Sequence, residues 1–200
     1  MQPKYLEYDS FATVAISGQS GSGKTSTVRF IIAQLLLNNT AIIICDPHGN
    51  AGNGALAESI KPIIPFLYMP VAITLEDRIK AFDYVHSILR DRIDNGADNS
   101  QRIVIILDEA TQHFIESSRE QVDKVARMLQ SLANEGRKAN IRVFLLSQNF
   151  HQDFIGSRSV RSSITHVLFH RTSTDEVKLL APSMPAKEAR AIARKAACHP

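Results

Sequence analysis

Apolar and polar residues along this chain form separate blocks rather than alternating one by one. Five short blocks are apolar almost throughout: 13–18 (TVAISG), 41–46 (AIIICD), 102–109 (RIVIILDE), 141–148 (IRVFLLSQ) and 165–171 (THVLFHR). Apolar runs without strict alternation are typical of strands that are buried on both faces of a parallel sheet. A sixth, shorter block, 66–69 (FLYM), is expected to form a short strand.

Between these blocks, apolar positions recur at helical spacing, which predicts helices over roughly 24–37, 75–93, 117–136 and 185–197. In the third of these segments the apolar positions are Val122, Val125, Met128, Leu129 and Leu132. Alternation of strands and helices predicts an α/β fold, in which a mostly parallel central sheet is flanked by helices and ligands bind at the carboxyl edge of the strands. The chain shows no repeat or evident linker, so we expect one domain over residues 1–200.

The composition is that of a soluble protein, with 44% hydrophobic and 22% charged residues. No apolar run approaches the roughly 20 residues that a membrane helix needs, so we expect no direct membrane insertion. With only two cysteines, Cys45 and Cys198, a disulfide framework is not expected and a reducing cytoplasm fits. Residues 135–200 hold 11 Lys and Arg against 5 Asp and Glu, a basic balance that suits a polyanion partner or simply solvates helices.

A phosphate-binding loop is predicted where the first strand meets the first helix. Gly18, Gly23, Lys24 and Thr25 match the pattern G-x-x-x-x-G-K-[ST]. In that pattern backbone N–H groups and the helix N-terminus bind phosphates, the lysine reaches the β- and γ-phosphates, and the hydroxyl binds Mg²⁺. The predicted nucleotide-binding residues are Gly18, Gln19, Ser20, Gly21, Ser22, Gly23, Lys24, Thr25 and Ser26.

A second motif ends the strand over 102–109, where five apolar residues lead into Asp108 and Glu109. This is the Walker B pattern, in which a buried strand brings Asp108 to the coordination shell of the metal. Glu109 is then placed to orient and deprotonate an attacking water. The pair favours hydrolysis of the nucleotide, and the alternative is that both acids cap the next helix.

A third motif is the polar tip of the strand over 141–148, which ends in Ser147, Gln148 and Asn149. An amide at this place could contact the γ-phosphate or the lytic water, and would then report whether the γ-phosphate is present. Turn formation explains the same residues equally well, because Ser and Asn favour loop starts.

With these motifs in place, the chain resembles the FtsK–HerA superfamily of P-loop ATPases, which pump DNA, over about residues 12–180. Beyond the phosphate loop, the resemblance rests on three stretches: CDPHGN (45–50), VHSILRDRI (85–93) and LANEGRKANIRVFLLSQN (132–149). It implies a RecA-like P-loop NTPase core that uses ATP and Mg²⁺ and works as a ring, usually a hexamer, with each active site between two subunits.

The same resemblance implies roles for single residues. Gln148 would be the γ-phosphate sensor, and Arg137 the arginine finger that acts on the neighbouring subunit's nucleotide. Arg161 and Arg171 are rival fingers, and Arg137 could instead be an ordinary basic residue at a helix C-terminus. Asp46 and His48 would lie near the edge of the nucleotide, although His48 could equally be a turn residue.

The expected function is therefore ATP-driven translocation of double-stranded DNA by a ring of identical subunits, in DNA transfer, segregation or genome packaging. The alternative is a secretion- or conjugation-type ATPase that acts on a protein substrate or partner. Arg158 and Arg161, in the loop after Gln148, are candidate DNA contacts.

Some features of the family are not found in these 200 residues. The 200 residues contain no segment like the membrane anchor or winged helix of FtsK or the β-barrel of HerA. The basic helix expected over 185–197 stands where the family has a closing strand. We expect a nearly bare motor core that is cytoplasmic, or virion-associated if it packages a genome, and a membrane-associated or portal protein is a candidate partner.

Overall fold

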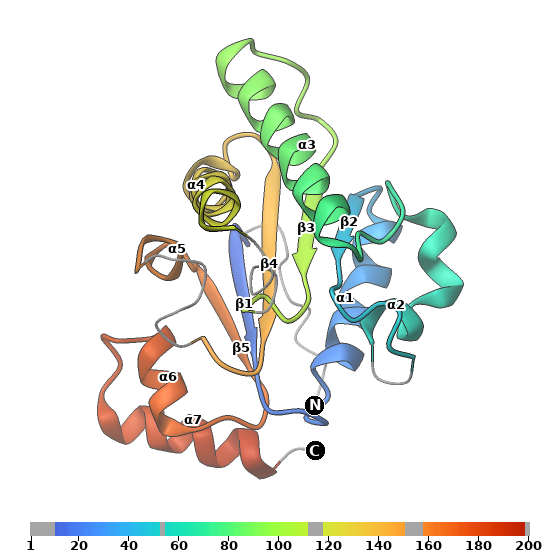
Figure 1. Ribbon diagram of the computed structural model, residues 1–200. Coiled ribbons are helices and arrows are strands. Elements are labelled where there is room, and N and C mark those ends of the chain that lie inside the picture. The colour runs from blue at the N-terminus through green and yellow to red at the C-terminus, as the bar shows by residue number, and fades with distance from the viewer. Residues whose placement is uncertain (1–10, 53–54, 112–117, 151–157, 199–200) are drawn as a thin grey trace.

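A parallel five-stranded sheet forms the centre of the molecule (Figure 1). The computed structural model describes residues 11–52, 55–111, 118–150 and 158–198. In sheet order the strands are β2 (Ala41–Cys45), β3 (Ile103–Leu107), β4 (Ile141–Ser147), β1 (Thr13–Ser17) and β5 (His166–Phe169). Every pairing between them is parallel, which confirms the expected α/β class.

The register of the strands places the three predicted motifs at one edge. Ser17 of β1 lies opposite Ser147 of β4, and Leu107 of β3 lies opposite Leu145 of β4. The phosphate loop, the Asp108–Glu109 pair and Gln148 each follow directly after one of these strands. Because parallel strands end at the same edge, all three motifs meet at the carboxyl edge of the sheet.

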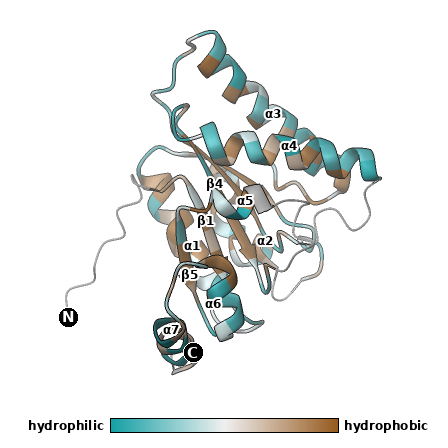
Figure 2. Ribbon diagram, turned by 90° about the vertical axis from the view of Figure 1, so that its left-hand side faces the viewer, coloured by the Kyte–Doolittle hydropathy of each residue, from teal (hydrophilic) through white to brown (hydrophobic). Residues whose placement is uncertain are grey.

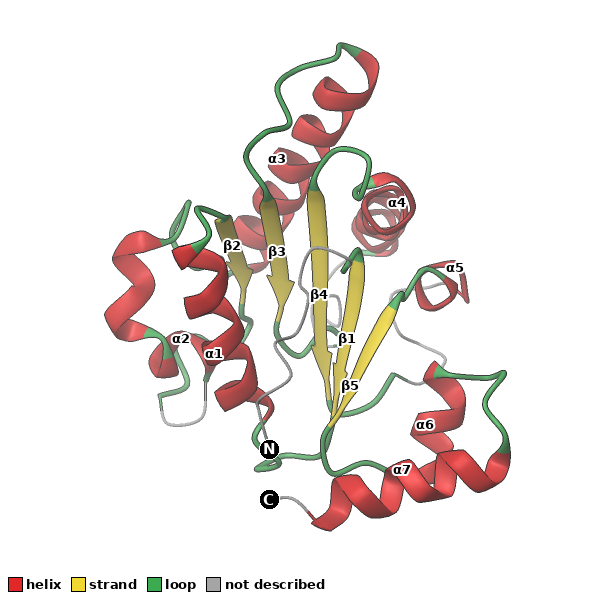
Figure 3. Ribbon diagram, turned by 180° about the vertical axis from the view of Figure 1, so that it is seen from behind, coloured by secondary structure: helices red, strands yellow, loops and turns green. Residues whose placement is uncertain are grey.

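Both faces of the sheet are covered by helices (Figures 1 and 3). On one face, α3 (Leu75–Asp94) and α4 (Arg119–Glu135) pack against alternate strand residues such as Ile105 and Val143. On the other face, α1 (Lys24–Leu37), α2 (Leu56–Ser59) and the 3-10 helix η2 (Lys61–Phe66) enclose the intervening residues, such as Val104 and Ile106. Burial on both faces explains why the strands are apolar throughout.

The predicted helices are found within one or two residues of their expected bounds. α4 begins with a capping box, in which the Ser118 side chain accepts from the Gln121 N–H and the Gln121 side chain accepts from the Ser118 N–H. In Figure 2, α3 and α4 show alternating hydrophilic and hydrophobic bands, as expected of helices that bury one side. No helix in the described part of the chain combines the length and apolarity that a membrane crossing requires.

The expectation of a strand over 66–69 is wrong. η2 extends to Phe66, and the following residues run beside the edge strand β2 with a single bridge, between Cys45 and Ala72. The Tyr68 N–H donates to the Ile42 carbonyl and the Ala72 N–H to that of Ile44. Pro70 lies between them and has no N–H to donate, so no regular ladder forms there.

Three helices precede or follow β5 in the chain: α5 (Arg158–Ser162) before it, and α6 (Thr174–Leu180) and α7 (Ala186–Cys198) after it. α7 is the predicted basic helix, and it packs against α6 and β5 (Figure 3). Since α6 follows β5 by a short turn, it begins close to the carboxyl edge of the sheet, where the motifs lie.

Candidate nucleotide site

A cavity of about 670 Å³ lies at the carboxyl edge of the sheet, a volume in the range of small-molecule sites. Four regions of the chain line it: the phosphate loop with the first turn of α1, residues within 48–51 and 55–59, the residues after β3, and the tip of β4. Its lining includes most of the predicted site, namely Ser20, Gly21, Ser22, Gly23, Lys24, Thr25, Ser26, His48, Asp108, Glu109 and Gln148.

The phosphate loop owes its shape to glycine and to the neighbouring strands. Gly21 and Gly23 have φ values of 71° and 91°, in the left-handed region that a side chain disfavours. The Gly18 N–H donates to the Ser147 carbonyl at 3.3 Å, and the Gln19 N–H to the Arg171 carbonyl at 2.8 Å. The first turn of α1 lines the cavity, and within the described residues no side chain caps it, so its N–H groups remain available to a phosphate.

His170, directly after β5, supports this loop, and the sequence motifs did not point to it. Its Nδ1 lies 3.0 Å from the Ser22 carbonyl, and since that oxygen can only accept, Nδ1 carries the proton. Burial lowers the pKa of His170, which favours this neutral form. A Cβ on Gly18 would come within 2.5 Å of the His170 Cβ and 2.7 Å of the Ser22 Oγ, so only glycine fits there.

Lys24 is buried, with 8% of its surface exposed, although it carries an ammonium group. Its Nζ donates to the carbonyls of Gly18 and Gln19, so it lies folded against the loop. Burial lowers the pKa of Lys24, while the charges of Glu109 and Asp108 act in the opposite direction. The ammonium is therefore held inside the cavity close to both carboxylates.

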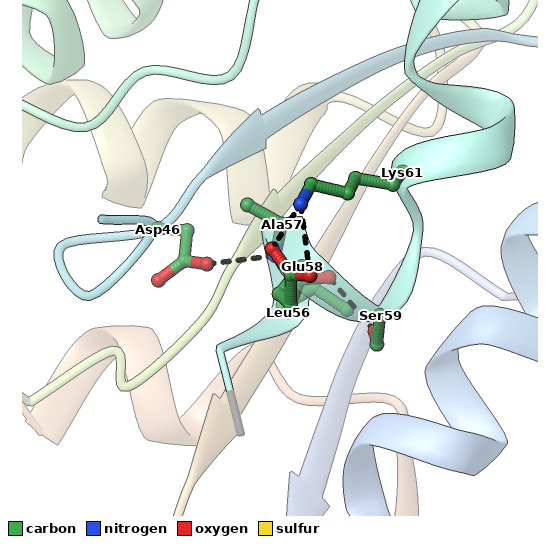
Figure 4. A network of polar contacts seen from close by, with 6 residues as sticks. All are labelled: Asp46, Leu56, Ala57, Glu58, Ser59 and Lys61. Carbon is green, nitrogen blue, oxygen red and sulfur yellow. Dashed lines mark hydrogen bonds and ion pairs between the residues drawn. The ribbon is translucent and has the colours of Figure 1, made fainter. Parts of the chain in front are cut away.

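Asp46 holds the segment after β2 in place (Figure 4). Its carboxylate is fully buried, with Oδ1 accepting from the His48 N–H at 2.9 Å and Oδ2 from the Ala57 N–H at 3.0 Å. These bonds join the Asp-Pro-His segment to α2, so Asp46 shapes the wall of the cavity, and His48 lines it with an exposed side chain.

Figure 4 also shows how the short helix α2 continues that wall. The Ser59 hydroxyl donates to the Leu56 carbonyl at 2.8 Å, and Lys61 forms an exposed ion pair with Glu58 at 2.9 Å. Glu58 and Ser59 line the cavity on this side.

Asp108 and Glu109 differ in environment. Asp108 is buried, and desolvation together with the charges of Asp46 and Glu109 raises its pKa to about 7. Glu109 has a φ of 43°, a left-handed conformation that is strained for a residue with a side chain. Neither acid is a helix cap in the described residues, because α4 is capped by Ser118.

Gln148 reaches Glu109 from the neighbouring strand. Its Nε2 donates to Glu109 Oε1 at 3.2 Å, and its side chain is exposed to the cavity. The turn at this strand end is made by Ser147 instead, whose hydroxyl accepts from the Asn149 N–H and donates to the Asn149 carbonyl. Gln148 is therefore free of the turn and available to the site.

The predicted arginines whose side chains the structure describes do not converge on this cavity. Arg137 is exposed in the turn between α4 and β4, at the opposite edge of the sheet, and Arg161 is half-buried in α5 before β5 begins. Arg171 is exposed next to the phosphate loop. Arg158 begins α5 but its side chain lies outside the described residues, as do residues 151–157 of the loop after Gln148.

Known structures share this arrangement of strands and helices. The pCW3 conjugation coupling protein TcpA, solved in its monomer form with ATPγS, superposes with a TM-score of 0.72 at 17% identity over 92% of this chain and 55% of its own. This chain thus spans about half the length of TcpA. The genome packaging NTPase B204 from Sulfolobus turreted icosahedral virus 2, solved with AMPPCP, gives a TM-score of 0.59 at 18% identity over 91% of this chain and 86% of its own.

EssC from Geobacillus thermodenitrificans (ATPases 2 and 3) gives a TM-score of 0.61 at 12% identity, over 87% of this chain and 35% of its own. These neighbours confirm the expected RecA-like P-loop fold. Comparison with curated protein sequences gives no match. The family model described as "Helicase HerA, central domain" matches residues 4–158, which include all three motifs. The resemblance to the FtsK–HerA superfamily is thereby confirmed: the chain belongs to the family of the HerA helicase central domain and is a P-loop ATPase.

Proposed function

We propose that this ATPase is a motor that moves double-stranded DNA as a ring of identical subunits, with six subunits by resemblance to its superfamily. The contact between Glu109 and Gln148 carries the proposal. It joins the carboxylate that would activate water to an amide at the tip of a different strand. Loss of the γ-phosphate would break or re-form this contact, and β4 would transmit the change to the rest of the subunit.

Each group in the cavity has a role in hydrolysis under this proposal. The loop N–H groups and Lys24 bind the phosphates, which would draw the ammonium away from the carbonyls of Gly18 and Gln19. Glu109 accepts a proton from the attacking water, and the Gln148 amide orients that carboxylate. The left-handed backbone at Glu109 is a strain of the kind found where a side chain must be aimed for function.

Thr25 and Asp108 would hold Mg²⁺ together with the phosphate oxygens. The donor set fits, because a cation would offset the repulsion that Asp46 and Glu109 exert on the Asp108 carboxylate. Among the residues that the structure describes, no group of three or more His, Cys, Asp or Glu is arranged to bind a metal. This suits Mg²⁺, which proteins usually bind through one or two carboxylates and substrate phosphates.

Two observations favour DNA as the substrate. TcpA is a conjugation coupling protein and B204 a genome packaging NTPase. In addition, α7 has an exposed basic side, formed by Lys187, Arg190, Arg194 and Lys195. The first three are spaced at i, i+3 and i+7, so they lie on one side of the helix and can contact a phosphate backbone. A portal or membrane-associated partner would attach such a motor to its compartment.

A ring would bring an arginine of one subunit to the cavity of its neighbour. Arg137 is at the far edge of the sheet, so it could act only on the nucleotide of a neighbouring subunit. A guanidinium supplied in this way stabilises charge on the transferred phosphoryl group, and in related enzymes its effect on turnover is large.

The test is the ATPase rate as a function of protein concentration, with and without linear double-stranded DNA, at low and high salt. Lys24→Ala and Arg137→Ala are measured separately and mixed, with Lys138→Ala, an exposed neighbour in the same turn, as the matched control. We expect the rate to rise steeply with concentration and with DNA, and the DNA effect to disappear at high salt. Mixing should restore activity in part, because one variant supplies the arginine and the other the phosphate loop.

The ring motor would be refuted if the ATPase rate did not change with protein concentration, with DNA or when the two variants are mixed. If Arg137→Ala is active, the same mixing experiment with Arg171→Ala and Arg161→Ala identifies the finger. A rate that responds to concentration but not to DNA would favour the alternative, an ATPase that acts on a protein substrate.

A further inference from the structure

A buried glutamate outside the predicted motifs connects two parts of the ATPase site. Glu176, in the first turn of α6, is only 3% exposed. Its Oε1 accepts from the backbone N–H of Phe150 at 2.8 Å and from the hydroxyl of Ser17 at 3.2 Å. Both donor residues are fully buried, so water does not substitute for these bonds.

The two donors belong to the two segments that must be aligned for hydrolysis. Ser17 is the last residue of β1 and directly precedes Gly18, the first residue of the phosphate loop. Phe150 follows Gln148 by two residues, after the turn that ends β4. One oxygen atom therefore bridges the residue before the phosphate loop and the segment after Gln148, beyond the point where the pairing of β1 with β4 ends.

Burial of a carboxylate is costly, and an apolar residue would fill the same space without that cost. Nor is the side chain needed to begin α6, because the Ser173 hydroxyl already accepts from the Glu176 N–H. Hydrogen bonds that the carboxylate accepts inside the protein offset this cost. Those from Ser17 and Phe150 join Glu176 to two segments of the ATPase site.

We infer that Glu176 is a positioning residue for ATP hydrolysis: it aligns the phosphate loop with Gln148 and ties both to α6. The inference rests on the proposed function in one respect, the role of Gln148 at the γ-phosphate. Since α6 packs against α7, Glu176 also links the site to the helix whose basic side is exposed.

The experiment compares Glu176→Ala and Glu176→Gln with Asp175→Ala, which removes an exposed carboxylate from the adjacent position of the same helix. Steady-state kcat and KM are measured in the full chain, and the affinity for a fluorescent ATP analogue is measured by titration. We expect Glu176→Ala to lower kcat by about tenfold or more and to change the affinity by less than about threefold, because misalignment affects the transition state more than ground-state binding. Glu176→Gln keeps an oxygen that can accept both bonds and should retain most of the activity.

Ser17→Ala provides a second test that remains available if Glu176→Ala does not fold, as judged by thermal unfolding. It removes one donor and should lower kcat in the same way, though by less. In the Glu176→Gln background it should still lower kcat. In the Glu176→Ala background, where that variant folds, it should cause no further loss, because the two residues act through one bond.

A kcat of Glu176→Ala within about twofold of wild type would overturn the inference, as would losses that add for Ser17 and Glu176. Equal losses in Glu176→Gln and Glu176→Ala would also overturn it, since the charge rather than the linkage would then be required. Gln148→Ala separates this result from the proposed function: if Gln148→Ala is fully active, the sensor role fails, whatever Glu176 does.

Discussion

Asp108 is expected to destabilise the fold that positions it, and the substitution Asp108→Asn measures by how much. The pKa of Asp108 is raised from 3.8 to about 7 by burial and by the charges of Asp46 and Glu109. An asparagine has nearly the same shape but cannot ionise. It should therefore keep the packing of the site and remove the cost of a buried negative charge.

The sign of the effect follows from where the proton is bound. Below pH 3.8 the carboxyl is protonated in both the folded and the unfolded chain. Between pH 3.8 and about 7 only the folded chain holds the proton, so the free energy of unfolding falls as the pH rises. At about 1.4 kcal/mol for each pH unit, the full loss is about 4 kcal/mol and is complete above pH 7. Asp108→Asn should thus be more stable than wild type by up to about 4 kcal/mol at pH 8, and by only about 1 kcal/mol at pH 4.5.

The assay is urea unfolding at these two pH values in the presence of EDTA, so that no metal offsets the charge. Because the chain has no tryptophan, circular dichroism at 222 nm is the signal. Asp123→Asn, which removes an exposed carboxylate on α4, is the control and should show no gain at either pH. The reasoning is refuted if Asp108→Asn gains equally at both pH values or is less stable than wild type at pH 8.

Three further outcomes are expected. Gly18→Ala should lower the thermal unfolding midpoint, by a destabilisation of about 1–3 kcal/mol, and weaken binding of a fluorescent ATP analogue, because the new Cβ would lie 2.5 Å from the His170 Cβ. In a Cys198→Ser background, Cys45 should react with a thiol reagent at pH 8 only after unfolding, since burial raises its pKa to about 12; reaction in the native protein would contradict this. Phe82→Ala, which truncates a fully buried side chain of α3, should cost about 3–5 kcal/mol in urea unfolding, and a cost below 1 kcal/mol would show that the core closes around the gap.

Sequence patterns predicted the parts of the molecule that are determined by residues close to one another in the chain. The strands are continuous apolar runs because both faces of the sheet are covered, and the phosphate loop is a contiguous motif whose glycines supply its conformation. The short helices α2, α5 and α6 have too few turns to show a helical period, so they were not expected. The position of Arg137 relative to the cavity depends on strand order and on the turn before β4, which no local pattern encodes.

The residues that support the site were missed for a different reason: their partners are distant in sequence. His170 contacts Ser22 across 148 positions, and Glu176 contacts Ser17 across 159. Neither contact follows from a spacing motif, because both depend on the sheet that places β5 beside β1. The predicted strand over 165–171 includes His170, whereas β5 ends at Phe169, so the predicted bounds hid His170 inside the strand.

Two helices begin with the same capping-box spacing, but only one of them forms the complete capping box. Ser118 and Gln121 form the reciprocal capping box that their spacing predicts. Ser173 and Glu176 have the same spacing, and the Ser173 hydroxyl does cap the Glu176 N–H, but the Glu176 side chain is buried against Ser17 and Phe150. A surface glutamate in a capping box would gain a bond and remain hydrated, so local energetics alone do not select the buried position. Departures of this kind concentrate at functional sites, and this one occurs where α6 meets the strand that carries the phosphate loop.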